Sequence, residues 1–454
     1  MKDYTQLLQK QRAFFDTNAT KSVAFRVDAL KKIYDWTKNN QDKISLALKQ
    51  DLNKSGFEAY ATEIGIVLSE ISHTLKHIKK WSKPKRVRTP LTSFKAKSYV
   101  FSEPFGVSLI MSPWNYPFQL AIVPLVASIS AGNCAVVKPS AYSPSTSQVI
   151  YDMAKELFDE SFVSVILGGR EENQGLLDQK FDYIFFTGGV EVGKTVMSCA
   201  SKHLTPVTLE LGGKSPCIID KSADIKLTAK RLIWGKLINC GQTCIAPDYV
   251  YVHSSLKNEL VKHIQQNVVD FYGENPLQNE SYPKMVNKKH FDRVCDLIDD
   301  NVLIGGQKDE QSLKIAPTLL NATWESKSMQ QEIFGPVLPV IEFDDINQVV
   351  DVIKSKPKPL ALYLFAKDKK VQNKVLGSIS FGGGCVNDTI MHIATSNMPF
   401  GGVGNSGMGC YHGKYGFDTF SHKKSVLKKS LAIDIKLRYP PYKDSAGILK
   451  KIQK

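Results

Sequence analysis

The strongest constraint on the fold is a series of short, nearly continuous hydrophobic runs that alternate with segments of helical periodicity. In the first half of the chain these runs are "GVSLIMS", "CAVVKPS", "FVSVILGG", "YIFFTGG", "PVTLELGG" and "SPCIIDK". Strands that are buried on both faces show such continuous hydrophobicity, whereas half-exposed strands alternate. Helical patterns lie between most of the runs, at residues 117–131, 145–158 and 190–200. Repeated strand–helix–strand units predict a parallel, doubly wound sheet.

A second series of the same kind begins after Lys221. A helical pattern runs through Trp234, and the hydrophobic runs "YVYVHSS", "FGPVLPVIEF", "PLALYLFAKD" and "GGGCVND" follow. The first eighty or so residues predict helices, one of which we expect to stop at Gly56. The cluster "PFGGVGNSGMG" predicts a loop whose backbone closely approaches another segment. We therefore expect an α/β protein with two open sheets.

The composition is that of an ordinary globular protein, with 43% hydrophobic and 23% charged residues in 454. The net charge of +15 comes mostly from scattered lysines, and without a nucleic-acid motif we expect no nucleic-acid partner. The 8 cysteines lack framework spacing, which is typical of a reducing compartment such as the cytoplasm. The predominance of lysine over arginine favours a bacterial source.

One uncharged segment, residues 104–137, is long enough to cross a membrane. Pro113, Pro117, Pro124 and Gly132 interrupt it, and a lipid-facing helix disfavours such residues. We expect this segment to form buried core instead. The start of the chain lacks the apolar stretch of a signal peptide and the last residues are charged, so we expect no membrane anchor.

The stretch "FFTGGVEVGKT" contains a complete phosphate-loop motif of ATP- and GTP-hydrolysing proteins, from Gly188 through Gly193 and Lys194 to Thr195. Glu191, in the middle of the loop, would repel polyphosphate oxygens, and no downstream strand plainly ends in a magnesium-binding aspartate. A strand, a glycine turn and a helix start also make a general anion site that suits a dinucleotide pyrophosphate. By itself the motif leaves both kinds of nucleotide-binding protein open.

Two other motifs carry candidate chemistry. In "NCGQTCIAP", Cys244 lies in a small polar turn where access and backbone N–H dipoles can favour a nucleophilic thiolate, although a small buried hydrophobe is the alternative. Cys240 has no second pair or histidine set beside it, so we expect no metal.

In "TLELGGKSP", Glu210 ends an apolar strand, where partial burial would make it a usable base. An ordinary surface glutamate is the alternative for Glu210.

Six motifs resemble, in order and approximate spacing, those of the NAD(P)-dependent aldehyde dehydrogenases. They are "PWNYP", "FTGGVEVGK", "LELGGKSP", "GQTC", "EIFGPV" and "PFGGVGNSGMG", and the resemblance extends from about Leu48 to the end of the chain. Finer features, including "DLNKSGFEAYATEIG", "VNDTIMHIA" and "SGMGCYHGKYGFDTFSH", resemble the class 3 branch. That branch includes enzymes for aromatic and for medium- or long-chain fatty aldehydes.

The resemblance implies a mechanism and a cofactor site. Cys244 would attack the aldehyde, Asn115 and the Cys244 backbone N–H would hold the oxyanion, and hydride would pass to NAD or NADP. Glu210 would activate the water that hydrolyses the resulting thioester. Lys194 and Thr195 would then merely continue a helix. The implied cofactor-binding residues are Trp114, Lys138, Ser140, Gly188, Gly189, Gly193, Glu332 and Phe334.

The resemblance also implies the substrate pocket and the assembly. Tyr116, Trp234 and Ile393 would line an apolar tunnel for aliphatic or aromatic aldehydes, with core packing as the alternative. We expect two Rossmann-like domains, with active-site residues between them, and a homodimer held by a small bridging element. The expected parts are an NAD(P)-binding domain of residues 1–80 and 104–211, a catalytic domain of residues 212–420, and a bridging or oligomerisation element of residues 81–103 and 421–454.

Three alternatives to this function stay open. A P-loop nucleotide triphosphatase would use the phosphate loop literally. An aldehyde dehydrogenase that acylates coenzyme A would pass the acyl group to a thiol, which Glu210 disfavours because water needs a base more than a thiol does. A catalytically silent homologue would keep only the fold, which the presence of Cys244, Glu210 and Asn115 disfavours.

The cofactor preference gives a direct test. Many members of the family have a glutamate three residues after the cofactor lysine, where it binds the adenosine 2′-hydroxyl and repels a 2′-phosphate, but here Ala141 stands at that position. Gly189 also replaces a commonly larger polar residue and holds the cofactor less firmly. We therefore predict that the protein uses both nucleotides and favours NADP. Binding titrations measure the two affinities, and a hundredfold preference for NAD, about 2.7 kcal/mol, would contradict this prediction.

Overall fold

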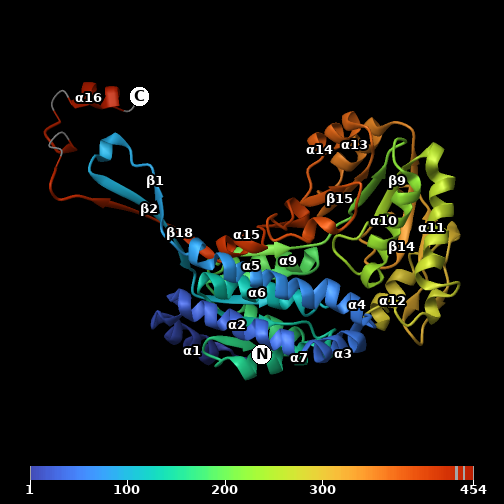
Figure 1. Ribbon diagram of the computed structural model, residues 1–454, viewed down its shortest axis with the longest axis horizontal. Coiled ribbons are helices and arrows are strands. Elements are labelled where there is room, and N and C mark those ends of the chain that lie inside the picture. Colours follow the sequence, from blue (N-terminus) through green and yellow to red (C-terminus); the bar gives the residue numbers. More distant parts are fainter. Residues whose placement is uncertain (1, 435–437, 443–444, 453–454) are drawn as a thin grey trace.

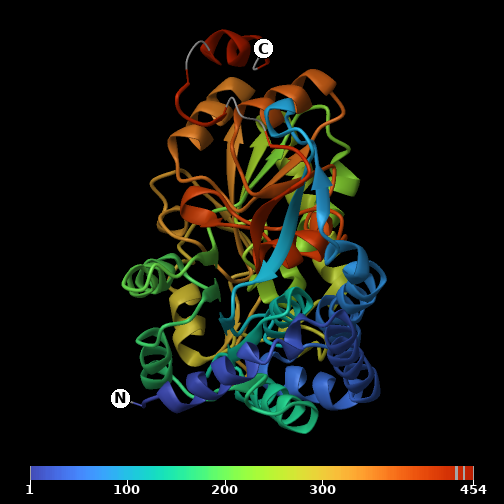
Figure 2. The same ribbon diagram turned by 90° about the vertical axis from the view of Figure 1, so that its left-hand side faces the viewer.

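The computed structural model describes residues 2–434, 438–442 and 445–452. Two large parts are each built around a β-sheet, and a narrow arm projects from the first of them (Figure 1). The N-terminal helices lie at the bottom of both overall views and the C-terminal helix α16 (Ser445–Ile452) lies at the top (Figures 1 and 2). The predicted α/β class with two open sheets is confirmed.

The first sheet has six strands in the order β17-β7-β6-β3-β4-β5. Neighbours are parallel except for β17, which is antiparallel to β7. The order reverses between β3 and β6, and doubly wound sheets bind ligands beside the carboxyl ends of the strands at such a point. The strands are β3 (Val107–Met111), β4 (Cys134–Lys138), β5 (Val163–Val165), β6 (Tyr183–Thr187), β7 (Val207–Glu210) and β17 (Gly407–Met408).

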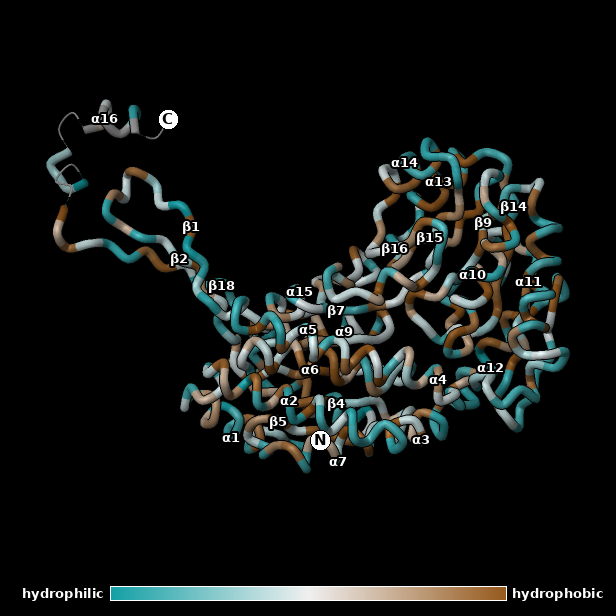
Figure 3. Tube along the Cα trace, viewed as in Figure 1, coloured by the Kyte–Doolittle hydropathy of each residue, from teal (hydrophilic) through white to brown (hydrophobic). Residues whose placement is uncertain are grey.

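Helix α6 (Gln119–Ala131) forms the centre of the first part, since all of its residues are buried. It packs on β3 and β4 and is covered by α2, α5 and α15, and hydrophobic residues gather along it (Figure 3). The uncharged segment 104–137 is therefore core, as predicted. Within the described ranges, no helix has the length and apolar character needed to span a bilayer. The other helices of this part are α1 (Thr5–Asp16), α2 (Val23–Asn39), α3 (Gln41–Leu52), α4 (Gly56–Ala59), α5 (Gly65–Trp81), α7 (Pro144–Leu157), α8 (Arg170–Leu177), α9 (Val190–Ser201) and α15 (Gly413–Thr419).

The expected helix stop at Gly56 is wrong. Helix α3 already ends at Leu52, where Asn53 takes a left-handed backbone with a φ of 56°. Gly56 instead begins α4, which the hydroxyl of Ser55 caps. A π-helical turn (Tyr60–Ile64) then joins α4 to α5. Such turns are rare and are frequent at functional sites.

The second sheet has seven strands in the order β10-β13-β14-β9-β8-β15-β16, parallel except for β10. Residues of α10 and α11 form a hydrophobic core on one face, and residues of α13 and α14 form another. The strands are β8 (Pro216–Ile219), β9 (Tyr249–His253), β10 (Val302–Ile304), β13 (Thr318–Asn321), β14 (Val337–Phe343), β15 (Ala361–Phe365) and β16 (Gly383–Val386), and a small hairpin pairs β11 (Lys308–Asp309) with β12 (Lys314–Ile315). The helices are α10 (Ile225–Leu237), α11 (Lys257–Tyr272), α12 (Lys288–Cys295), α13 (Ile346–Ser355) and α14 (Lys369–Ser378).

The arm is a three-stranded antiparallel sheet of β1 (Lys85–Val87), β2 (Ala96–Pro104) and β18 (Ser421–Lys429). Strand β18 pairs with β2 along its whole length, from Ser421 opposite Pro104 to Lys429 opposite Ala96. The two segments expected to form one bridging element thus meet in space. Residues 435–437, 443–444 and 453–454 of that element lie outside the described residues, and the proposed domain boundaries stay a prediction.

The glycine-rich loop closes on the first sheet. Gly407 pairs with Glu210, and Met408 pairs with Leu209, so that β17 extends the sheet beside β7. A Cβ atom at Gly407, whose φ is 143°, would lie 2.2 Å from the carbonyl oxygen of Leu209. The predicted close approach of backbone to backbone is therefore confirmed.

Candidate active site

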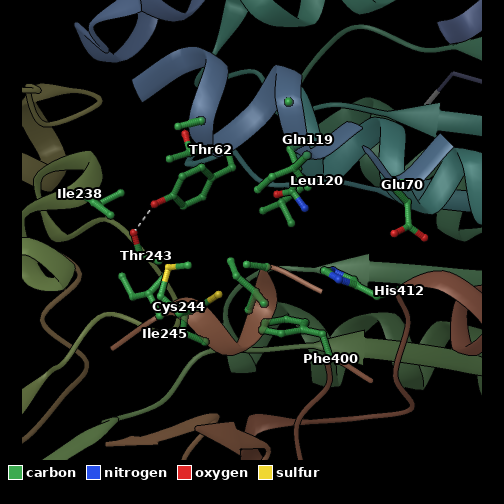
Figure 4. Close-up of a pocket in the computed structure, with 18 of the residues that line it drawn as sticks. Thr62, Glu70, Gln119, Leu120, Ile238, Thr243, Cys244, Ile245, Phe400 and His412 are labelled. Atoms are coloured by element: carbon green, nitrogen blue, oxygen red, sulfur yellow. Dashed lines mark hydrogen bonds between the residues drawn. The ribbon is translucent and has the colours of Figure 1, made fainter. Parts of the chain in front are cut away.

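A cavity of about 430 Å³ is lined by residues from both large parts of the molecule (Figure 4). Its walls come from the π-helical turn and α5, the start of α6, the carboxyl ends of β6 and β7, helix α10, the loop before β9, and the segment 390–412. Most of the lining side chains are apolar. The cavity therefore suits an apolar molecule that must meet a few polar groups.

Cys244 lies in the cavity wall, on the loop that leads into β9. The residues Asn239, Cys240 and Gly241 before it take left-handed backbone angles, with φ values of 52°, 55° and 72°, and turn the chain sharply. Burial, with a smaller contribution from nearby carboxylates, raises the pKa of the Cys244 thiol to about 12, although the backbone N–H groups of Cys244 and Ile245 favour the thiolate. The resting thiol is therefore protonated at neutral pH.

Glu210 is the last residue of β7 and is 2% exposed. Within the described part of the chain, neither of its carboxylate oxygens has a hydrogen-bond partner. Burial raises the pKa of Glu210 well above its ordinary value. Because Glu210 lines the same cavity as Cys244, it can exchange a proton with a molecule held there.

Asn115 is buried on the loop between β3 and α6. Its side-chain Nδ2 donates to the backbone carbonyl oxygen of Gln242 at 3.0 Å. Its backbone carbonyl oxygen accepts from Nδ2 of Asn239 at 2.6 Å. An amide nitrogen carries two hydrogens, so one remains for a further acceptor. On the next residue, the hydroxyl of Tyr116 shares a hydrogen bond of 2.6 Å with Thr243, drawn as a dashed line in Figure 4.

Lys138 and Ser140 lie at and just after the carboxyl end of β4. The Lys138 ammonium donates to the carbonyl oxygens of Pro139 and Gly168, at 2.8 and 2.7 Å. Burial lowers the pKa of Lys138 to about 8. The Ser140 hydroxyl accepts from the N–H of Tyr142 at 3.2 Å. These residues share one edge of the sheet with Asn115 and Glu210.

The three glycines of the phosphate-loop motif surround the start of α9. A Cβ atom at Gly188 would collide with the ring of Phe186 at 2.5 Å, and one at Gly193 would collide with Leu211 at 2.7 Å. Gly189, by contrast, faces open space and precedes a helix that no side chain caps. A helix N-terminus of this kind attracts an anion through its N–H groups and dipole.

Lys194 and Thr195 do not complete a triphosphate site. The Lys194 ammonium is exposed and pairs with Glu191 of the same helix at 2.8 Å. The Thr195 hydroxyl donates to the backbone carbonyl of Glu191 at 3.1 Å. Both side chains therefore bond Glu191 of their own helix. This agrees with the prediction that Lys194 and Thr195 are part of a helix.

Glu332 and Phe334 approach the first sheet from the loop before β14. The Glu332 carboxylate is half-buried and lies so close to Gly212 that a Cβ there would meet it at 2.2 Å. Burial, together with the charge of Asp248, raises the pKa of Glu332 to about 8. The ring of Phe334 meets that of Trp114 edge to face, with centroids 5.4 Å apart. Glu332 and Phe334 of the second part thus meet Gly212 and Trp114 of the first.

Tyr116, Trp234 and Ile393 all line the cavity. Sequence reasoning missed Glu70 and His412, which lie toward the other end of the cavity from Cys244 (Figure 4). These two residues come from α5 and from just before α15, and no local motif marks them as neighbours. Their side chains add to the polar groups of a mostly apolar cavity.

Comparison with known proteins identifies the family. A model of the aldehyde dehydrogenase family matches residues 1–426. The chain belongs to the aldehyde dehydrogenase family. It is 46% identical to the 4,4'-diaponeurosporen-aldehyde dehydrogenase of Staphylococcus aureus over 98% of both chains. It is 43% identical to aldehyde dehydrogenase family 3 member B1 of Mus musculus, over 97% of this chain and 95% of that protein.

Solved structures agree with this assignment. The substrate-bound state of Staphylococcus aureus AldH superimposes with a TM-score of 0.98 at 46% identity, covering all of both chains. An NAD-dependent aldehyde dehydrogenase from Sinorhizobium meliloti gives a TM-score of 0.86 at 26% identity, covering 94% of this chain and 87% of the other. This protein is accordingly a class 3-like aldehyde dehydrogenase, an oxidoreductase that depends on NAD or NADP.

The raised pKa of Cys244 predicts how its thiol reacts in the enzyme without ligands. Alkylation by iodoacetamide should accelerate about tenfold per pH unit from pH 7 to 9, because only the scarce thiolate reacts. Glu332→Gln removes a negative charge that disfavours the thiolate, so this variant should react faster than the wild type at pH 9. The exposed Glu342 provides a control, since Glu342→Gln should leave the rate unchanged. A plateau in the wild-type rate below pH 8 would contradict the prediction.

Proposed function

We propose that this enzyme oxidises aliphatic or aromatic aldehydes to carboxylic acids through a thiohemiacetal and then a thioester on Cys244, which water activated by Glu210 hydrolyses. The observation that carries the proposal is that the Cys244 thiol and the unpartnered Glu210 carboxyl group line one cavity. A thiol suits this reaction because the thiohemiacetal carbon can release hydride and the acyl–sulfur product remains hydrolysable.

The first step joins the Cys244 sulfur to the aldehyde carbon. Because burial disfavours the free thiolate, the proton leaves the thiol as the bond forms and passes to solvent. The carbonyl oxygen then becomes an oxyanion. The second amide hydrogen of Asn115 and the backbone N–H of Cys244 would hold that oxyanion, and such donors typically lower a barrier by about 3–4 kcal/mol.

The facing edges of the two large parts fit a dinucleotide. Three features support this fit: an uncapped helix N-terminus beside Gly189, open space at that glycine, and a half-buried Glu332 carboxyl group opposite. When bound, NAD or NADP supplies the acceptor for the hydride that leaves the thiohemiacetal carbon. The residues that would hold it are Lys138 and Ser140 for the adenosine half, Gly188, Gly189 and Gly193 for the pyrophosphate, and Trp114, Glu332 and Phe334 for the nicotinamide half.

Hydrolysis of the thioester returns the enzyme to its starting state. The Glu210 carboxylate takes a proton from a water molecule, whose oxygen bonds to the acyl carbon while the Cys244 thiolate leaves. General-base assistance of this kind typically accelerates a step by about 10²–10⁴-fold. Burial raises the pKa of Glu210, so its carboxylate is a stronger base than that of an exposed glutamate.

The cofactor and substrate preferences follow from what surrounds each site. Ala141 is exposed and carries no carboxylate, which supports acceptance of a 2′-phosphate and hence of NADP as well as NAD. The mostly apolar cavity supports aliphatic and aromatic aldehydes over charged semialdehydes. A related enzyme is named for 4,4'-diaponeurosporen-aldehyde, which is consistent with a preference for extended apolar substrates here. A bacterial source and a cytoplasmic location stay predictions.

We further propose that the enzyme is a homodimer that the arm holds together. Edge strands β1 and β18 have no neighbour on their outer sides within the described residues, and unpaired strand edges favour association. Leu91, Leu427 and Leu431 on and beside the arm are 74%, 49% and 101% exposed. Sedimentation velocity at micromolar concentration should therefore give one species of twice the chain mass. A monomer or a tetramer would contradict this proposal.

Trapping the acyl group tests the proposed mechanism. In Glu210→Gln, oxidation should proceed once and hydrolysis should stall, so that mass spectrometry finds the acyl mass on Cys244 after incubation with aldehyde and NADP. The adduct should form readily with saturated aldehydes of increasing length and poorly with a carboxylate-bearing semialdehyde, since the cavity is apolar. Glu160→Gln changes an exposed glutamate in the same way and should hydrolyse its thioester normally. Failure to find any adduct in Glu210→Gln would overturn the mechanism.

A further inference from the structure

A completely buried ion pair lies behind the candidate active site. Nζ of Lys54 lies 2.5 Å from Oε1 of Glu63, and both side chains are fully excluded from solvent. Lys54 follows α3, and Glu63 belongs to the π-helical turn. A buried ion pair is weak evidence for stability, because its attraction must first offset the loss of hydration of both charges. The contacts that the pair makes are therefore more informative than its strength.

The ion pair contacts the loop that carries Asn115. The Lys54 ammonium donates to the carbonyl oxygen of Asn115 at 3.2 Å and lies 4.0 Å from the ring centroid of Tyr116. The second oxygen of Glu63 accepts from the backbone N–H groups of Phe118 and Gln119, at 2.9 and 3.1 Å. These N–H groups begin α6, which has no cap of its own. The pair therefore holds the loop at its middle, beside Asn115, and at its end, where α6 begins.

The other side of the same loop faces the turn before Cys244. The Asn239 side chain donates to the backbone carbonyl of Asn115, and the Asn115 side chain donates to the backbone carbonyl of Gln242. Glu58, a second acidic residue near Lys54, accepts from the backbone N–H of Asn239 at 2.6 Å. Charged side chains thus support both the Asn115 loop and the turn against which its amide rests.

We propose that Lys54 and Glu63 are positioning residues that hold the Asn115 amide at the oxyanion site. The inference rests on the proposed role of Asn115 in the reaction. Oxyanion donors must lie about 2.7–3.1 Å from the oxyanion, and misplacement by about 1 Å can cost a hundredfold in rate. Apolar side chains could fill the same volume, but they could satisfy neither the Asn115 carbonyl nor the first N–H groups of α6.

The test neutralises the pair without changing its shape. Lys54→Met and Glu63→Gln should each lower kcat at least tenfold while KM changes less than threefold, because the substrate cavity itself is unaltered. Alkylation of Cys244 by iodoacetamide forms no oxyanion and should stay within twofold of the wild-type rate. Should one of these variants fail to fold, the double variant Lys54→Met/Glu63→Gln leaves no unpaired charge buried and should show the same loss of kcat.

A matched control lies at the start of β3, the strand whose other end leads into the Asn115 loop. Arg12 pairs with Asp182, whose carboxylate accepts from the backbone N–H of Val107 at the start of β3. Arg12→Met removes a cation that supports the backbone in a similar way but far from Asn115, and should leave kcat within twofold. If Arg12→Met lost as much kcat as Lys54→Met, the effect of Lys54 would be explained by a general loss of stability, and the proposal would be overturned.

A double-mutant cycle with Asn115→Ala distinguishes positioning from an independent effect. If Lys54 acts through the Asn115 amide, Lys54→Met should lower kcat less than twofold once that amide is absent. A tenfold loss in both backgrounds, or a parallel loss of alkylation rate, would overturn the positioning proposal. If Asn115→Ala itself left kcat unchanged, the proposed role of Asn115 would fail first. If Asn115→Ala lowered kcat and Lys54→Met did not, only the positioning proposal would fail.

Discussion

The geometry of the active site depends on two hydrogen bonds that run in opposite directions between Asn115 and the turn before β9. Asn115 belongs to a loop that leaves the first sheet, whereas Asn239 and Gln242 belong to the approach to the second. Left-handed backbone at Asn239 costs energy and persists where surrounding contacts determine it. Here those contacts come from the other large part of the molecule. These two hydrogen bonds thus link the loop after β3 to the turn before β9, and Cys244 and Glu210 line the cavity beside them.

Exclusion of water is the second constraint, and it acts on four ionisable groups of the site in the same direction. Burial raises the pKa of Cys244, of Glu210 and of Glu332, and it lowers that of Lys138, so each group is held toward its neutral form. The resting site therefore disfavours the thiolate that the reaction needs. The same low dielectric strengthens the attraction between fixed N–H donors and an oxyanion that forms among them. Reactivity is consequently linked to the arrival of substrate.

Local patterns predicted much of the fold because each strand and helix leaves its own signal. The continuous hydrophobic runs marked most strands of both sheets but missed β10, β13 and β17, and the end of one run located Glu210 at a carboxyl edge. The phosphate-loop motif located the start of α9, although the side chains of Lys194 and Thr195 bond Glu191 of that same helix. The prediction that a helix ends at Gly56 was wrong because a glycine can also begin a helix when a capping residue precedes it. Here Ser55 is that capping residue. A single glycine does not distinguish these two uses.

The sequence by itself determined the order of most strands and helices, the buried character of α6, and the candidate nucleophile and base, because periodicity and short motifs lie within one stretch of chain. Only the tertiary structure decided that Lys54 and Glu63 support the Asn115 loop, and that Glu70 and His412 face one cavity. In an amphipathic helix or a polar loop, such residues have the same pattern as any solvated side chain. Their roles depend on contacts between distant segments, and these exist only after the chain has packed.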